Sequence, residues 1–106
     1  MNDRVLSFLG LCRRAKKLVI GAEVTEESVR LGRSRLVIYA DDASQNSLKK
    51  VLRACEAHGV EAVCANRGKD ALSRALGRLC AVLSVEDSGF AAKLLEMIDS
   101  EQERRI

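Results

Sequence analysis

The sequence LVIYA, residues 36–40, is one of the two longest uninterrupted apolar runs in the chain. A run of this length is typical of a strand whose two faces are both covered, as in a sheet between two layers of helices. The polar sequence DDAS, residues 41–44, follows it directly and supplies side chains that can cap a helix. Together they predict a buried strand that passes into a helix, which is the repeating unit of an α/β fold.

Helix and strand patterns alternate on both sides of this run. Apolar residues at helical spacing predict a helix up to about residue 15, a helix over 22–31, one ending at 58, a short one between 66 and 77, and a last one over about 88–99. Short apolar runs predict strands over 18–20, 36–40, 60–64 and 80–85. We therefore expect a three-layer α/β/α sandwich with a four-stranded mixed sheet, formed by one domain over residues 1–106.

Polar residues before the predicted helices are expected to cap them. The candidate caps are Asn2 or Asp3, Asn66, and Asp87 or Ser88. Asp41 and Asp42 can be read either as paired catalytic carboxylates or as caps, and their position between a strand and a helix favours caps. The polar end, residues 100–106, is expected to fray.

The composition is that of a soluble globular protein. Of 106 residues, 47% are apolar and 31% are charged, and no apolar run is long enough to span a membrane. With no visible export signal, the chain is expected in the cytoplasm and without a membrane partner. The four cysteines, at positions 12, 55, 64 and 80, form no C-x-x-C pair and lie in apolar patterns. They are expected to be reduced core residues, and no metal site is expected.

No pattern of an enzyme or of a cofactor site is present. The seven glycines are never closer than nine positions apart, so no phosphate-binding glycine loop exists. The single histidine, His58, falls beside Gly59 at a predicted helix end, where contact with the last carbonyls is favoured over catalysis. We expect no catalytic residue, no cofactor and no small-molecule substrate.

The positive charge is concentrated in the first third of the chain. Residues 1–36 hold eight basic and four acidic side chains, whereas the remainder holds ten and eleven. The basic positions of this segment include Arg13, Arg14, Lys16, Lys17, Arg30, Arg33 and Arg35. Such a segment is either an electrostatic footprint for a polyanion or a solvated helix face, and the sequence favours neither.

Gly21 stands between a predicted strand and the start of a predicted helix. The free N–H groups at a helix start can bind a phosphate or a base edge. Glu23 can accept hydrogen bonds from the edge of a guanine base. An equally good interpretation is that Glu23, Glu26 and Glu27 only interact favourably with the dipole of the helix. Because the three aromatic side chains all lie in apolar patterns, a base-stacking platform is not expected.

Three stretches carry a resemblance to a known family. They are LGLCRRAKKLVIG (residues 9–21), RLGRSRLVIYADDAS (residues 30–44) and EDSGFA (residues 86–91). Together they resemble the bacterial YlxQ-like members of the ribosomal L-seven-Ae superfamily of kink-turn RNA binders. The resemblance spans nearly the whole chain and implies an α/β/α sandwich, in agreement with the alternation described above.

The resemblance implies an RNA site at the Gly21 helix start, where relatives carry a pattern like G-x-N-E-x-x-K. In a gap-free alignment Gly21 is kept, while Glu23, Val24 and Glu27 replace the asparagine, glutamate and lysine. A second alignment keeps Glu23 as the family glutamate and needs a one-residue gap before Gly32. In either alignment a glutamate replaces the lysine, which is expected to weaken binding to a standard kink-turn.

The resemblance also implies a second contact region in the loop before the last strand. Here that loop contains Arg78, Leu79 and Cys80, whose apolar part can pack against a flipped-out nucleotide. Lys17, Arg33 and Arg35 are expected to add phosphate contacts beside Gly21.

Two functions remain open on this basis. The first is a non-enzymatic RNA-binding protein associated with ribosomes or another structured RNA. The second is a protein-interaction module that has kept the fold and lost the RNA site, as Glu26 and Glu27 would suggest. The feature that separates them is whether the basic side chains converge on the face that carries Gly21.

Overall fold

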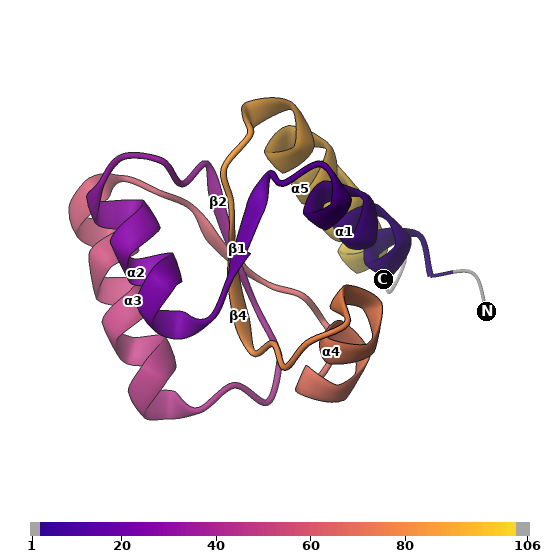
Figure 1. Cartoon of the computed structure of the whole chain (residues 1–106), viewed down its shortest axis with the longest axis horizontal. Helices are drawn as coiled ribbons and strands as arrows, with labels where there is room; N and C mark the ends of the chain where they lie inside the picture. The colour runs from indigo at the N-terminus through magenta and orange to yellow at the C-terminus, as the bar shows by residue number, and fades with distance from the viewer. Residues whose placement is uncertain (1–2, 104–106) are drawn as a thin grey trace.

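The computed structural model describes residues 3–103 (Figure 1). Helices and strands alternate along them in the expected order. The elements are α1 (Arg4–Arg14), β1 (Leu18–Ile20), α2 (Ala22–Arg30), β2 (Leu36–Tyr39), α3 (Gln45–His58), β3 (Ala62–Cys64), α4 (Lys69–Leu76), β4 (Val82–Val85) and α5 (Ser88–Glu103). No helix in this part of the chain is both long and apolar enough to cross a membrane.

The four strands form one mixed sheet in the order β1-β4-β2-β3. The central strand β4 runs antiparallel to β1 and β2, while β3 lies parallel to β2. Since β1 and β2 therefore point the same way, both end at the edge of the sheet where β4 begins. This arrangement fixes which loops can meet in a common site.

Helices cover both faces of the sheet, so the predicted three-layer α/β/α sandwich is confirmed. Helices α2 and α3 lie on one face, and α1, α4 and α5 lie on the other (Figure 1). Alternate residues of a strand point to opposite faces. Leu83 accordingly packs in the core under α1, α4 and α5, whereas Val82 packs under α2 and α3.

The expected caps are confirmed for two helices. The Asp3 carboxylate accepts a hydrogen bond from the Leu6 N–H at 3.1 Å, at the start of α1. The Asp87 carboxylate accepts one from the Phe90 N–H at 2.9 Å, at the start of α5. In both helices the cap lies three positions before its donor, so local sequence is enough to find it.

Two other caps differ from the prediction. Asp42 does not cap α3, which follows it; its Oδ1 accepts from the Lys69 N–H at 2.8 Å and so caps α4. Gly68, and not Asn66, is the N-cap residue of α4. The loops after the parallel neighbours β2 and β3 meet at one sheet edge, so a cap can come from the adjacent loop.

The predicted fraying of residues 100–106 is wrong for residues 100–103, which continue α5. Arg67 explains the added length, because its Nη1 donates to Glu101 Oε1 at 2.9 Å and its Nε donates to Asp3 Oδ2 at 2.8 Å. The link holds the end of α5 against the start of α1. Residues 104–106 lie outside the described part.

All four cysteines are free thiols. Cys12, Cys55 and Cys80 are buried, and burial raises the pKa of the Cys12 and Cys80 thiols to about 11. These thiols are therefore protonated at neutral pH. Among the described residues, no group of histidine, cysteine or acidic side chains could hold a metal ion.

Candidate nucleic-acid interface

The start of α2 is open to a ligand. Gly21, the N-cap residue, has φ +122° and ψ 150°, a conformation that residues with a Cβ rarely adopt. No side chain caps this helix end, so the first N–H groups of α2 have no partner within the helix. Such N–H groups, with the partial positive charge of the helix end, suit an anionic or carbonyl oxygen.

The loop before β4 lies directly beside this helix start. The Gly21 N–H donates to the Val82 carbonyl at 2.8 Å, and the Ala40 N–H donates to the Ala81 carbonyl at 2.8 Å. The ends of β1 and β2 therefore hold the 78–81 loop between them. This geometry brings together the Gly21 helix start and the loop before the last strand, the two RNA contact regions that the family resemblance implies.

Two exposed apolar side chains flank the junction. Leu79 is 82% exposed and Val24 is 45% exposed. A Cβ built on Gly21 would lie 3.6 Å from Val24 Cγ2, so Val24 leans back over the helix start. Exposed apolar groups beside open N–H groups are suited to the face of a nucleobase held next to its phosphate.

Cys80 does not belong to this surface. Cys80 is 1% exposed and lies in the core, and its N–H donates to Ser73 Oγ at 2.9 Å. The loop therefore presents Arg78 and Leu79 outward and Cys80 inward. A contact of RNA with the Cys80 side chain would require the core to open.

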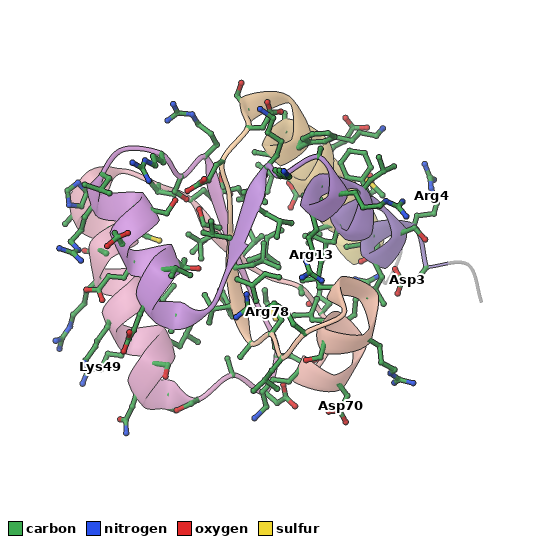
Figure 2. All side chains as sticks on the ribbon, in the orientation of Figure 1. Asp3, Arg4, Arg13, Lys49, Asp70 and Arg78 are labelled. Atoms are coloured by element: carbon green, nitrogen blue, oxygen red, sulfur yellow. The ribbon has the colours of Figure 1, made fainter. Side chains whose placement is uncertain are left out.

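Arg13 reaches the same loop from α1. Its Nη1 lies only 3.1 Å from the position that a Cβ on Gly77 would occupy, so the guanidinium rests against the turn that ends α4. Figure 2 places Arg13 between α1 and this turn, with Arg78 beside the β4 entry. Arg13 and Arg78 therefore supply positive charge close to Leu79. In the sequence Arg13 belongs with the other N-terminal cations, and only the fold brings its guanidinium to this turn.

The cations expected beside Gly21 are at the other end of the sheet. Lys17 precedes β1 and Arg35 precedes β2, whereas Gly21 follows β1. The four residues from Lys17 to Gly21 correspond to about 13 Å of extended strand. The expectation that Lys17, Arg33 and Arg35 flank Gly21 is thus wrong, because a strand puts residues close in sequence at opposite edges.

The glutamates of α2 line a groove against α3. The groove has a volume of about 480 Å³, and Glu23, Glu26 and Glu27 form one of its walls. Asn46 and Lys50 of α3 contribute to the opposite wall. Glu23 lies two positions after Gly21, so the groove opens next to the helix start.

The model of the ribosomal protein L7Ae/L30e/S12e/Gadd45 family matches residues 3–95. The chain belongs to this family. The L7Ae family is non-enzymatic, and the resemblance drawn from residues 9–21, 30–44 and 86–91 is confirmed.

Curated relatives in the L7Ae family have similar lengths. The chain is 36% identical over 93 residues to RNA-binding protein YlxQ of Bacillus subtilis (strain 168), covering 87% of this chain and 92% of the relative. It is 32% identical over 99 residues to RNA-binding protein YlxQ of Enterococcus faecium, covering 92% and 94%.

Solved structures agree with the fold of the L7Ae family. A protein of unknown function from Bacillus halodurans C has a TM-score of 0.86 and 34% identity, covering 92% of this chain and 99% of that one. The 15.5kD RNA binding protein of Giardia lamblia has a TM-score of 0.71 and 26% identity, covering 94% and 92%.

Proposed function

We propose that this L7Ae family member binds structured RNA through the edge of the sheet that carries Gly21. The hydrogen bond from the Gly21 N–H to the Val82 carbonyl carries this proposal, since it joins an uncapped helix start to the Arg78–Leu79 loop. The curated relatives are named RNA-binding proteins, which supports RNA as the ligand.

Each part of this edge has a distinct role in the proposed complex. The N–H groups of α2 receive a phosphate or base oxygen, and Glu23 accepts from a base edge in the adjoining groove. Arg13 and Arg78 contact phosphates, and Leu79 packs on an unstacked base. The resemblance to kink-turn binders supports a kinked RNA, ribosomal RNA included, as the target class, bound in the cytoplasm.

We expect Arg78→Ala to weaken binding to all structured RNAs alike and to flatten the salt dependence by about one unit of slope, as for a lost phosphate contact. Filter binding across a salt series, with one kinked and one unkinked RNA, measures both effects. Lys49→Ala is the matched control, because Lys49 lies on α3 and points away from the sheet (Figure 2). Equal losses in the two variants would show that only net charge matters.

We expect Glu27→Lys to strengthen binding to a kink-turn RNA by about tenfold at low salt, equal to about 1.4 kcal/mol. The change replaces an anion on α2 by the cation that relatives carry in the gap-free alignment. Glu96→Lys makes the same charge change on α5, which covers the other face of the sheet. Unchanged kink-turn affinity in Glu27→Lys would mean that the RNA does not dock along α2.

A protein-interaction module is the alternative, and the glutamate wall of the α2–α3 groove is the observation that favours it. In that case the protein would bind neither RNA at low salt, and Arg78→Ala would change nothing. The same filter-binding series therefore decides between the two functions.

A further inference from the structure

Four basic side chains gather at the end of the sheet opposite Gly21. Lys16 and Lys17 come from the loop between α1 and β1, and Arg33 and Arg35 come from the loop between α2 and β2. All four are exposed. We call this group the basic end; it lies at the edge drawn uppermost in Figure 1, where β4 finishes and α5 begins.

The two loops of the basic end are held on either side of one strand. The Glu86 N–H donates to the Lys17 carbonyl at 2.7 Å, and the Arg35 N–H donates to the Val85 carbonyl at 2.8 Å. Because β4 lies between β1 and β2, the backbones of Lys17 and Arg35 are two strand spacings apart, about 9.5 Å. A few successive phosphates of one nucleic-acid strand can bridge that distance.

The arginine loop is held in place by backbone and side-chain hydrogen bonds. The Arg33 and Ser34 N–H groups both donate to the Ser28 carbonyl, at 2.9 and 3.2 Å. The Ser34 side chain is 4% exposed and accepts a hydrogen bond from the buried Ser84 hydroxyl at 2.7 Å. Since Ser34 is fixed inward, its neighbours Arg33 and Arg35 are presented outward.

The lysine loop is fixed in a similar way. The Lys16 N–H donates to the Arg13 carbonyl at 2.9 Å, and the Lys17 N–H donates to the Cys12 carbonyl at 3.0 Å. These bonds close the end of α1, with Lys16 in the left-handed region at φ 60°. The cations are thus positioned before any ligand arrives, which lowers the entropy lost on binding.

The neighbouring acids Glu86 and Asp87 offset part of the charge of the basic end, but they are fewer than its four cations. Glu86 Oε2 accepts from the Ser28 hydroxyl at 2.6 Å, and Asp87 caps α5. Glu61 lines a groove with Arg35 on the side of α3, which limits the basic surface in that direction. In residues 3–103, none of the four cations forms an ion pair within 4.0 Å.

We propose that the basic end is a second RNA surface, which holds the phosphate backbone of a helix that flanks the RNA segment bound at Gly21. It lies about 13 Å from Gly21 along β1, so one folded RNA can reach both edges. The basic end offers positive charge and no cluster of exposed aromatic rings, so we expect its contacts with RNA to be independent of base sequence. This proposal rests on the proposed RNA-binding function.

The test uses two RNA probes and the full chain. The short probe is a kinked hairpin whose helices are too short to span the distance of about 13 Å from Gly21 to the basic end, and the long probe extends one helix by one turn. Only the long probe can therefore run from Gly21 past the basic end. Fluorescence anisotropy over a salt series gives the affinity and the salt slope for each probe.

We expect the variant with Lys16→Gln, Lys17→Gln, Arg33→Gln and Arg35→Gln to bind the long probe at least about tenfold more weakly, with the salt slope lower by about two to four. Its affinity for the short probe should stay within about twofold. The pair Lys49→Gln and Arg53→Gln on α3 controls for lost charge elsewhere, and thermal unfolding checks that the variants are folded.

Each other outcome overturns a stated claim. If the long probe binds no better than the short one and the fourfold variant binds both normally, the second surface is absent while the Gly21 site stands. If the fourfold variant binds both probes more weakly by the same factor, the four cations attract RNA through their overall charge and do not form a separate binding surface. If the unaltered protein binds neither probe, the proposed RNA-binding function fails, and this inference with it.

Discussion

Leu83→Ala is expected to lower the free energy of unfolding by about 2–5 kcal/mol, as for a buried large-to-small substitution. Leu83 is 0% exposed and lies in the central strand β4. Its register partners are Ile20 in β1 and Ile38 in β2, so strands enclose it on both sides and helices lie above it. Because strands and helices surround Leu83, the neighbouring side chains have little room to move into the cavity that the substitution leaves.

Leu79→Ala is the matched control for this substitution. Leu79 lies four positions earlier but is 82% exposed, so the same loss of methyl groups should change stability by less than about 0.5 kcal/mol. Urea unfolding of both variants gives the comparison. A loss below half a kcal/mol in Leu83→Ala would mean that β4 is not the central strand.

The layered fold could be predicted because its signals are local. The first four residues of the run LVIYA form β2, and Leu36, Val37 and Ile38 are buried, as expected for an apolar run in a sheet covered on both faces. Helix starts with a cap three positions before the donor, at Asp3 and Asp87, were found for the same reason. These features depend on a few consecutive residues only.

The capping of α4 could not be predicted, because its cap comes from a distant part of the chain. Asp42 and Lys69 are 27 positions apart and meet only when β2 and β3 pair in parallel. From the local sequence alone, Asp42 is expected to cap the helix that follows it. Register between strands, which no short pattern specifies, decides such contacts.

The candidate site was predicted in part for the same physical reason. Gly21 and Leu79 could be found from the local sequence, because Gly21 is a glycine at a helix start and Leu79 is an apolar residue in a loop. Arg13 was missed as a neighbour of Leu79 because its contact with Gly77 spans 64 positions. Lys17 was placed beside Gly21 because four positions look close in sequence, although they span the length of β1.

The placement of the cations also bears on the choice between the two functions. Only Arg13 and Arg78 lie at the loop beside Gly21, while Lys17, Arg33 and Arg35 lie at the opposite edge. The basic side chains therefore do not converge on one face. This dispersal by itself counts against RNA binding at Gly21, and the choice of RNA rests on Arg13 and Arg78 at that edge and on the curated relatives named RNA-binding proteins.

Arg67→Met is expected to lower the free energy of unfolding by about 2–3 kcal/mol, less than the roughly 3–5 kcal/mol of a fully buried ion pair. The Arg67 side chain is 14% exposed and bridges Asp3 and Glu101, which are 29% and 32% exposed. Its removal leaves two half-buried carboxylates without their shared cation and frees the end of α5. Arg74→Met, at an exposed position in α4, is the control and should change stability little.

Arg67→Met should also reduce the amount of stability that the protein loses at low pH. Burial acts to raise the pKa of Asp3, but hydrogen bonds from Arg67 and from the Leu6 N–H outweigh it and hold the pKa below its ordinary value of 3.8. A carboxyl group whose pKa is lower in the folded state contributes stability above its ordinary pKa, and that stability is lost as the pH falls through the folded pKa. Without Arg67 this contribution shrinks, so urea midpoints of the variant should change less than those of the unaltered protein between about pH 5 and pH 2. Parallel pH profiles for the two proteins would show that Arg67 does not stabilise the ionised form of Asp3.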